Sequence, residues 1–133
     1  VQRQAGRVVS HEVDPAKPET LVSALAELLP TGAVQREDAA AWVAFGAAAS
    51  TRPWLAGPYW EALVIMRTWI EDVLVDTQQA GLMGTDLSPA EGARLVTALV
   101  NGLALDLLNA PPTEPDEVIG QLRSGLGLVL RGL

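Results

Sequence analysis

The most constraining feature of the sequence is an apolar stretch at residues 88–109, SPAEGARLVTALVNGLALDLLN. Ser88, Pro89 and Glu91 signal the start of a helix, because they suit the cap, the first helical position and a capping box. From Leu95 onward, leucine and valine surround the helix instead of forming one stripe, and such a helix needs cover on two sides. In a chain of 133 residues, we expect a second copy of the protein to provide one cover.

The rest of the chain also favours helices. Hydrophobic residues make up 49% of the chain and are mainly Ala, Leu and Val, and Ala and Leu have high helix propensity. No segment alternates with the period of two that is expected for a half-buried strand. The predicted helices are residues 1–13, 18–29, 34–50, 59–80, 88–109 and 114–130, with one further turn at 54–57. We therefore predict one all-α domain over residues 1–133, a bundle of about six helices.

The charge balance argues against direct nucleic-acid binding. Nine basic and sixteen acidic residues give a net charge of −7, whereas nucleic-acid binding needs a basic surface. The chain has no cysteine, which fits a reducing compartment, so we expect a cytoplasmic protein. The longest uncharged run, residues 39–51, is too short to cross a bilayer, and no membrane partner is predicted.

Catalytic signals are weak. His11 is the sole histidine, and a metal site would need two or three further ligands at suitable spacing, which the sequence does not offer. Ser10 and His11 do not form a nucleophile and base, because adjacent residues on a helix point apart. We therefore expect no enzymatic activity, no cofactor and no metal.

The aromatic residues are clustered. All four Trp, the one Tyr and the one Phe lie within residues 42–69. This cluster fits either an ordinary core or an apolar pocket with a few polar groups, such as those of Tyr59 and Arg67. Asn101 and Asp106 interrupt the apolar run near the end of the chain, where they are better suited to fixing the register of a helix interface than to catalysis.

Four segments together resemble the C-terminal regulatory domain of the TetR family of bacterial repressors, in particular its betaine-regulator-like members. They are residues 42–49, 53–56, 99–105 and 118–130. The third segment contains Asn101-Gly102-Leu103, and such members often have Asp where Asn101 stands. The resemblance covers nearly the whole chain but indicates no particular ligand.

The resemblance implies an N-terminal helix-turn-helix domain that is missing from this chain, with residues 1–13 as the end of the connecting helix. DNA would then be bound only through that missing domain. It also implies that the last two helices form a four-helix bundle with those of a second copy, giving a homodimer.

Our hypothesis is that the chain is the effector-binding and dimerisation domain of a TetR-like transcriptional regulator. A small, largely apolar ligand would bind between the first, third and fourth predicted helices. The pocket candidates are Trp42, Phe45, Ala49, Trp60, Leu63, Met66, Arg67 and Trp69. The candidates for the dimer interface are Leu95, Leu99, Leu103, Asp106, Leu122, Leu126 and Val129. The alternatives are a dimeric helical scaffold without a ligand and a helical-bundle enzyme with a metal.

Overall fold

The computed structural model describes residues 2–133, and these residues form six helices. The helices are α1 (Gln2–Ser10), α2 (Pro18–Ala26), α3 (Ala33–Ala49), α4 (Pro53–Gln79), α5 (Pro89–Asn109) and α6 (Pro115–Leu126). Within residues 2–133 there is no strand, only an isolated bridge between Met83 and Leu130. The predicted all-α class is confirmed, while the prediction for Val1 lies outside the described residues.

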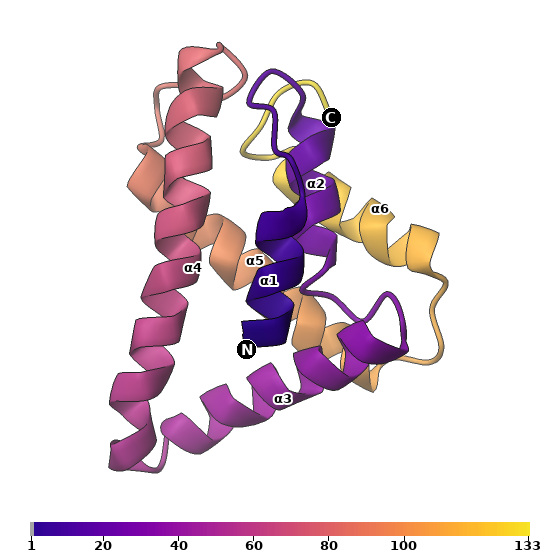
Figure 1. Ribbon diagram of the computed structural model, residues 1–133. Coiled ribbons are helices and arrows are strands. Elements are labelled where there is room, and N and C mark those ends of the chain that lie inside the picture. The colour runs from indigo at the N-terminus through magenta and orange to yellow at the C-terminus, as the bar shows by residue number, and fades with distance from the viewer. Residues whose placement is uncertain (1) are drawn as a thin grey trace.

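Helix α5 is the central element, because α3, α4 and α6 all pack against it (Figure 1). Its start has the predicted capping box: the Ser88 hydroxyl accepts a hydrogen bond from the Glu91 N–H at 3.1 Å, and the Glu91 carboxylate accepts one from the Ser88 N–H at 3.3 Å. Val96 and Val100 are buried on the inner side of α5. The predicted cover on one side is therefore present within the chain.

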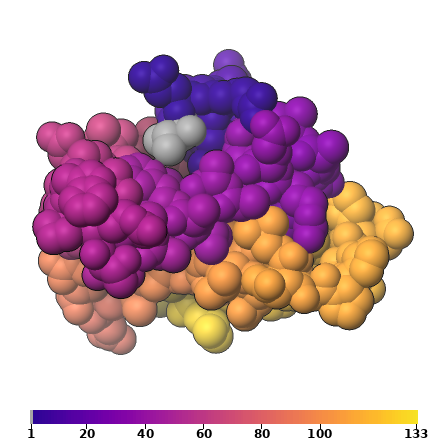
Figure 2. Space-filling model, turned by 90° about the horizontal axis from the view of Figure 1, so that it is seen from below, coloured from indigo at the N-terminus to yellow at the C-terminus, as the bar shows by residue number. Residues whose placement is uncertain are grey.

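The main core lies where α2, α5, α6 and the C-terminal half of α4 meet. Its largest fully buried aliphatic side chains are Leu21, Leu25, Leu29, Ile70, Leu74, Leu122 and Leu126. Helices α3 and α4 meet at a corner away from this core, and α1 lies between them (Figure 1). Seen from below, α3 crosses the face of the molecule between α1 and the C-terminal part of α5 (Figure 2).

Helix α4 is continuous from Pro53, whereas the sequence predicted a separate turn at 54–57. Pro58 lies inside the helix and leaves one backbone carbonyl without its usual N–H partner. The preceding residue is Gly57, which lacks the Cβ that normally clashes with a following proline ring in helical conformation. The helix therefore passes through this position without a break. No helix of residues 2–133 is long and apolar enough to cross a membrane.

Helix α6 ends at Leu126, four residues before the predicted end. Beyond it the backbone turns, and the Arg131 N–H donates to the Leu82 carbonyl oxygen at 2.8 Å. The C-terminal residues thus attach to the loop after α4 instead of extending the helix. This hydrogen bond gives the backbone near the end of the chain a partner. The periodicity of the sequence does not reveal such a contact.

Helices α1 and α2 also end earlier than predicted. The Ser10 hydroxyl donates to the Arg7 carbonyl at 2.6 Å, so it competes for a group that would continue α1. After α2, the Leu29 N–H donates to the Ala26 carbonyl at 3.1 Å in a tighter turn. Both changes are at helix ends and leave the order of the helices as predicted.

Candidate functional site

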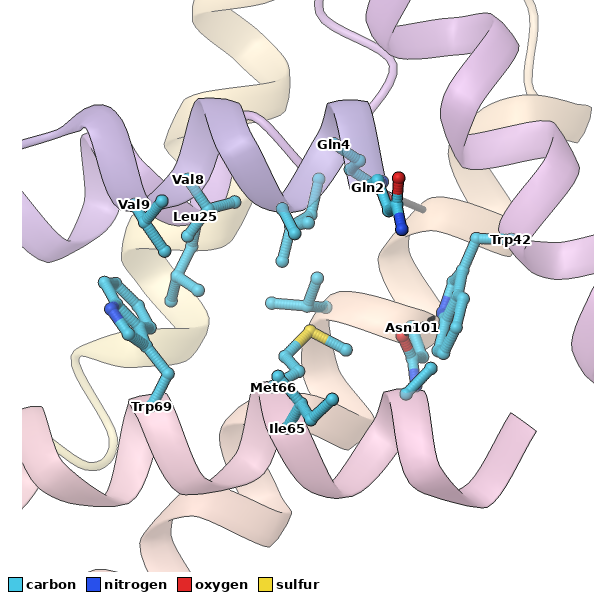
Figure 3. Close-up of a pocket in the computed structure, with 14 residues that line it drawn as sticks. Gln2, Gln4, Val8, Val9, Leu25, Trp42, Ile65, Met66, Trp69 and Asn101 are labelled. Carbon is cyan, nitrogen blue, oxygen red and sulfur yellow. Dashed lines mark hydrogen bonds between the residues drawn. The ribbon is translucent and has the colours of Figure 1, made fainter. Parts of the chain in front are cut away.

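A cavity of about 280 Å³ lies beneath α1 (Figure 3). All of the first five helices contribute to its wall, which places it on the α3–α4 side of the main core. Its lining residues are Gln2, Gln4, Ala5, Val8, Val9, Leu25, Leu28, Trp42, Ala62, Ile65, Met66, Trp69, Val100 and Asn101. Because α1 forms one wall, anything bound in the cavity contacts this helix directly.

The cavity wall is almost entirely hydrocarbon. Among residues 2–133, the side chains that line it include no charged group, and its only polar ones besides the indoles are the amides of Gln2, Gln4 and Asn101. Trp42 and Trp69 stand at opposite ends of the space (Figure 3). The Trp42 indole Nε1–H donates to the Asn101 Oδ1 at 3.0 Å. This composition suits an apolar ligand with few polar groups.

The other face of α1 is held by ion pairs. Arg7 Nη2 lies 2.7 Å from an Asp38 carboxylate oxygen, and Arg7 Nε lies 3.3 Å from Glu27. Arg3 Nε donates to both Asp38 oxygens at 3.2 Å. His11, just after the helix, donates from Nε2 to the Glu27 carboxylate at 2.9 Å. Arg3, Arg7 and His11 are spaced four residues apart and therefore share one face of the helix. We call these three residues, together with Asp38 and Glu27, the α1 clamp.

The clamp also changes the acidity of its carboxyls. Hydrogen bonds from Arg3 lower the pKa of Asp38 from 3.8 to about 2. Burial opposes this shift, and the hydrogen bond and charge of Arg7 add to it. Burial acts to raise the pKa of Glu27, but hydrogen bonds from His11 and Gln35 lower it on balance. Both carboxylates are therefore charged at neutral pH and hold α1 against α3 and the turn after α2.

An aromatic cluster fills the corner where α3 and α4 meet. The Trp42 and Tyr59 rings are stacked with centroids 4.8 Å apart, and Phe45 meets the edges of both. Gly46 allows this approach, since a Cβ there would lie 3.0 Å from the Tyr59 ring. Burial raises the pKa of Tyr59, although the Arg67 charge opposes this shift. Phe45 and Tyr59 thus pack against Trp42, which forms one end of the cavity.

Three of the eight pocket candidates line the cavity: Trp42, Met66 and Trp69. The other five lie elsewhere, and they are Phe45, Ala49, Trp60, Leu63 and Arg67. Trp60 is 55% exposed, and the Arg67 guanidinium lies over its ring at 5.3 Å from the centroid. Phe45 belongs to the aromatic cluster. The structure thus brings three of the candidates on α3 and α4 together at the cavity, and the helical register turns the other five away from it.

The pocket was expected between the first, third and fourth helices, but none of the eight candidate residues lies on α1. Ala5, Val8 and Val9 share an apolar face of this helix, and that face lines the cavity. Gln4 gave no signal, because a glutamine in a short amphipathic helix is usually exposed. Its burial is a consequence of how α1 packs on α2 and α3, which the sequence pattern does not show.

The dimer candidates fall into two groups. Leu122 and Leu126 are fully buried inside the chain and have no surface left for a second copy. Leu95 is 53% exposed, Asp106 is exposed, and Leu99, Leu103 and Val129 are partly exposed. The exposed group lies mainly on the outer side of α5. Leu122 and Leu126 are therefore core residues of the protomer.

Residues 2–133 contain no group of three or more His, Cys, Asp or Glu side chains that could hold a metal ion. His11 is instead bound to Glu27 within the α1 clamp. This gives the sole histidine of the chain a structural explanation.

Comparison with known proteins identifies the class to which this architecture belongs. Residues 18–131 match the family of the C-terminal domain of BetI-type transcriptional repressors, and the chain belongs to this family. The chain also superimposes on the crystal structure of a transcriptional regulator from Rhodococcus sp. Rha1, with a TM-score of 0.81 and 27% sequence identity. That match covers 99% of this chain and 69% of the other. No match is found among curated protein sequences.

The domain is therefore a regulatory domain of the TetR type, as the sequence resemblance predicted. Fold and family agree over nearly the whole chain. What the domain binds, and how two copies associate, are the subjects of the proposals below.

Proposed function

We propose that the domain binds a small apolar effector in the cavity beneath α1 and thereby controls DNA binding by a transcriptional regulator. The observation that carries this proposal is the position of α1. One face of this helix lines the cavity through Gln4, Ala5 and Val8, and the opposite face is held by the α1 clamp. A ligand that fills the cavity changes the contacts of α1 and meets the main core only along its edge, at residues such as Leu25 and Val100.

The proposed mechanism is a shift between two orientations of α1. A ligand moves such an equilibrium only when it binds one orientation more tightly than the other. In a dimeric regulator, the two DNA-binding units must reach half-sites roughly 34–36 Å apart. A small pivot of the helices that lead to these units therefore changes whether both can bind. In this mechanism the chain itself contacts no DNA, in keeping with its net charge of −7.

We further propose that the outer side of α5 forms the homodimer interface, together with the adjacent side of α6. Several exposed residues of α5 recur at helical spacing on this side: Leu95, Ala98, Gly102, Leu105 and Asp106. Leu95 and Leu105 are large apolar side chains that are half exposed in the single chain. Small residues between them allow a second helix to approach closely, which suits a four-helix bundle.

The effector proposal is tested by tryptophan fluorescence. Trp54 and Trp60 are exposed, so replacing both with Phe leaves the emission of Trp42 and Trp69 at the two ends of the cavity. Titration with a panel of apolar compounds is expected to change this emission at a saturable concentration. No response to any compound would instead favour a helical scaffold without a ligand.

A cavity-filling variant separates specific from unspecific binding. Ala62→Leu extends a side chain into the cavity wall and is expected to weaken binding more than about tenfold, since several ligand atoms are displaced. Ala44→Leu is the matched control, because Ala44 is exposed on α3. Equal affinities in both variants would place the ligand outside this cavity.

A further inference from the structure

We infer that the effector is a neutral amphiphile with one uncharged hydrogen-bonding head, such as a primary amide, and an apolar chain of about nine carbons. This inference rests on the proposed function of the cavity as an effector site. It assigns the head to the Trp42 end of the cavity and the chain to the Trp69 end.

The side chain of Gln4 presents an amide at the cavity wall. Its side chain is only 5% exposed, lines the cavity, and makes no hydrogen bond to any of residues 2–133. Its amide atoms still reach space that water can enter, because they are not among the fully buried side-chain atoms that lack a partner. A ligand that displaces this water must bond the amide in its place, because an unpaired buried polar group is costly. Gln4 therefore favours a ligand that offers a polar atom to its amide.

Asn101 presents a second amide at the cavity wall. Its Oδ1 accepts from the Trp42 indole N–H at 3.0 Å, and an indole N–H can only donate. The Asn101 amide NH2 is therefore left as a donor beside the cavity. Gln4 and Asn101 lie at the same end of the cavity as Trp42 (Figure 3). A head that carries both an acceptor oxygen and a donor hydrogen complements these two amides.

Within residues 2–133, no charged side chain lines the cavity. The basic side chains of α1 are paired with Asp38 and Glu27 in the α1 clamp, on the opposite face of this helix. Burying an ion without a counter-charge is expensive. A quaternary ammonium would need several aromatic faces around it, yet Trp42 and Trp69 are at opposite ends of the cavity and one face of Trp42 is stacked on Tyr59.

The size of the ligand follows from the volume of the cavity. A cavity of about 150 Å³ holds one benzene molecule. The present cavity of about 280 Å³ therefore accepts roughly eleven non-hydrogen atoms. Nonanamide has this size, and its chain would lie against the aliphatic side chains that lead to Trp69: Val8, Val9, Leu25, Ile65 and Met66.

The test uses four nine-carbon probes that differ only in the head: nonanamide, nonanoate, nonylammonium and n-nonane. Affinities are measured at neutral pH by fluorescence or calorimetry. Nonanamide is expected to bind at least about tenfold more tightly than either ion, because neither ion finds a counter-charge. Gln4→Met, which keeps the length of the side chain, is expected to weaken nonanamide binding about tenfold and leave n-nonane unchanged.

Gln79→Met is the matched control, since Gln79 is exposed at the end of α4; this variant is expected to bind all four probes like the wild type. Unchanged n-nonane binding by Gln4→Met also shows that this variant is folded. Equal binding of amide and ions, or no effect of Gln4→Met, would overturn the inference but leave the effector cavity in place. Failure of all four probes to bind would remove the proposed function and the inference together.

Discussion

The two halves of this domain are filled in different ways. Around α2, α6 and the inner side of α5, aliphatic side chains such as Leu122 and Leu126 are completely buried. Around α1, α3 and the first half of α4, large side chains are often exposed, and a cavity of about 280 Å³ remains. We call these the packed half and the cavity half.

The difference indicates that the packed half is rigid and supports the fold, whereas the cavity half can adjust to a ligand. Close packing makes the first half costly to deform. In the second half, α1 is held mainly by ion pairs at one face and by the cavity wall at the other. Such a helix can change its position without disturbing the core, which is the property that an effector-controlled helix needs.

The largest expected effect is on stability, and it should be confined to the packed half. Leu122→Ala removes a side chain with no exposed surface and should lower the free energy of unfolding by about 2–5 kcal/mol. Ile65→Ala changes a residue that is 70% exposed at the cavity and should cost about 0.5 kcal/mol or less. Urea unfolding measures both variants. Similar losses would contradict the distinction between the halves.

The next effect concerns the outer side of α5. Leu95→Glu would place a charge in the proposed dimer interface and should weaken dimerisation about a hundredfold, because the carboxylate would be buried without a partner. Val34→Glu is the control, since Val34 is a similarly exposed residue on α3, at 45%. Sedimentation at micromolar concentration distinguishes them. A wild-type monomer, or equal dissociation in both variants, would refute this interface.

A smaller effect is expected from the α1 clamp. Asp38→Asn removes the shared partner of Arg3 and Arg7 and should destabilise the fold by about 1–2 kcal/mol, a modest value because solvent screens this pair. Amide hydrogen exchange should show the loss mainly in α1. Exchange that rises equally in α6 would mean that the clamp stabilises the whole domain.

The same clamp predicts a pH dependence. The pKa of Asp38 is lowered from 3.8 to about 2 in the folded chain. Its contribution is therefore complete above a pH of about 4 and is lost as the pH falls toward 2. The difference in stability between wild type and Asp38→Asn should shrink over that interval. A difference that stays constant across it would show that the charge of Asp38 is not responsible.

The smallest expected effect compares two glycines of α6. A Cβ at Gly120 meets nothing within 4 Å, whereas one at Gly125 would lie 2.6 Å from the Leu99 side chain. Gly120→Ala should therefore stabilise the helix by about 0.5–1 kcal/mol. Gly125→Ala should gain less or destabilise, because Leu99 must move. Thermal unfolding of both variants measures the difference, and equal gains would mean that α5 and α6 are not closely packed at this point.

Sequence alone predicted the packed half well. The apolar pattern of residues 88–109 and its capping signal gave α5 almost to the residue, because local rules and burial agree there. In α6, Gly125 lies against the Leu99 side chain of α5, so the two helices are closely packed at this position. The predicted ends of α1, α2 and α6 were too late, since local hydrogen bonds end α1 and α2 and a contact with the distant loop at Leu82 holds the chain after α6.

The cavity half was predicted less completely. Clustered aromatic residues pointed to α3 and α4, but Phe45 and Tyr59 pack in the corner against Trp42 instead of lining the cavity. The periodicity of a sequence indicates which residues share a helix face, but it does not indicate which element that face packs against. The burial of Gln4 depends on how α1 sits on its neighbours, and no local pattern encodes it.

The most direct test of the account is amide hydrogen exchange with and without saturating nonanamide. If the ligand occupies the cavity, exchange should slow in α1 and in the part of α4 around Met66, which line it. Helix α6, which lies in the packed half, should be unchanged. Binding that leaves α1 unaffected, or that protects α6 as strongly as α1, would contradict the claim that α1 covers the effector site.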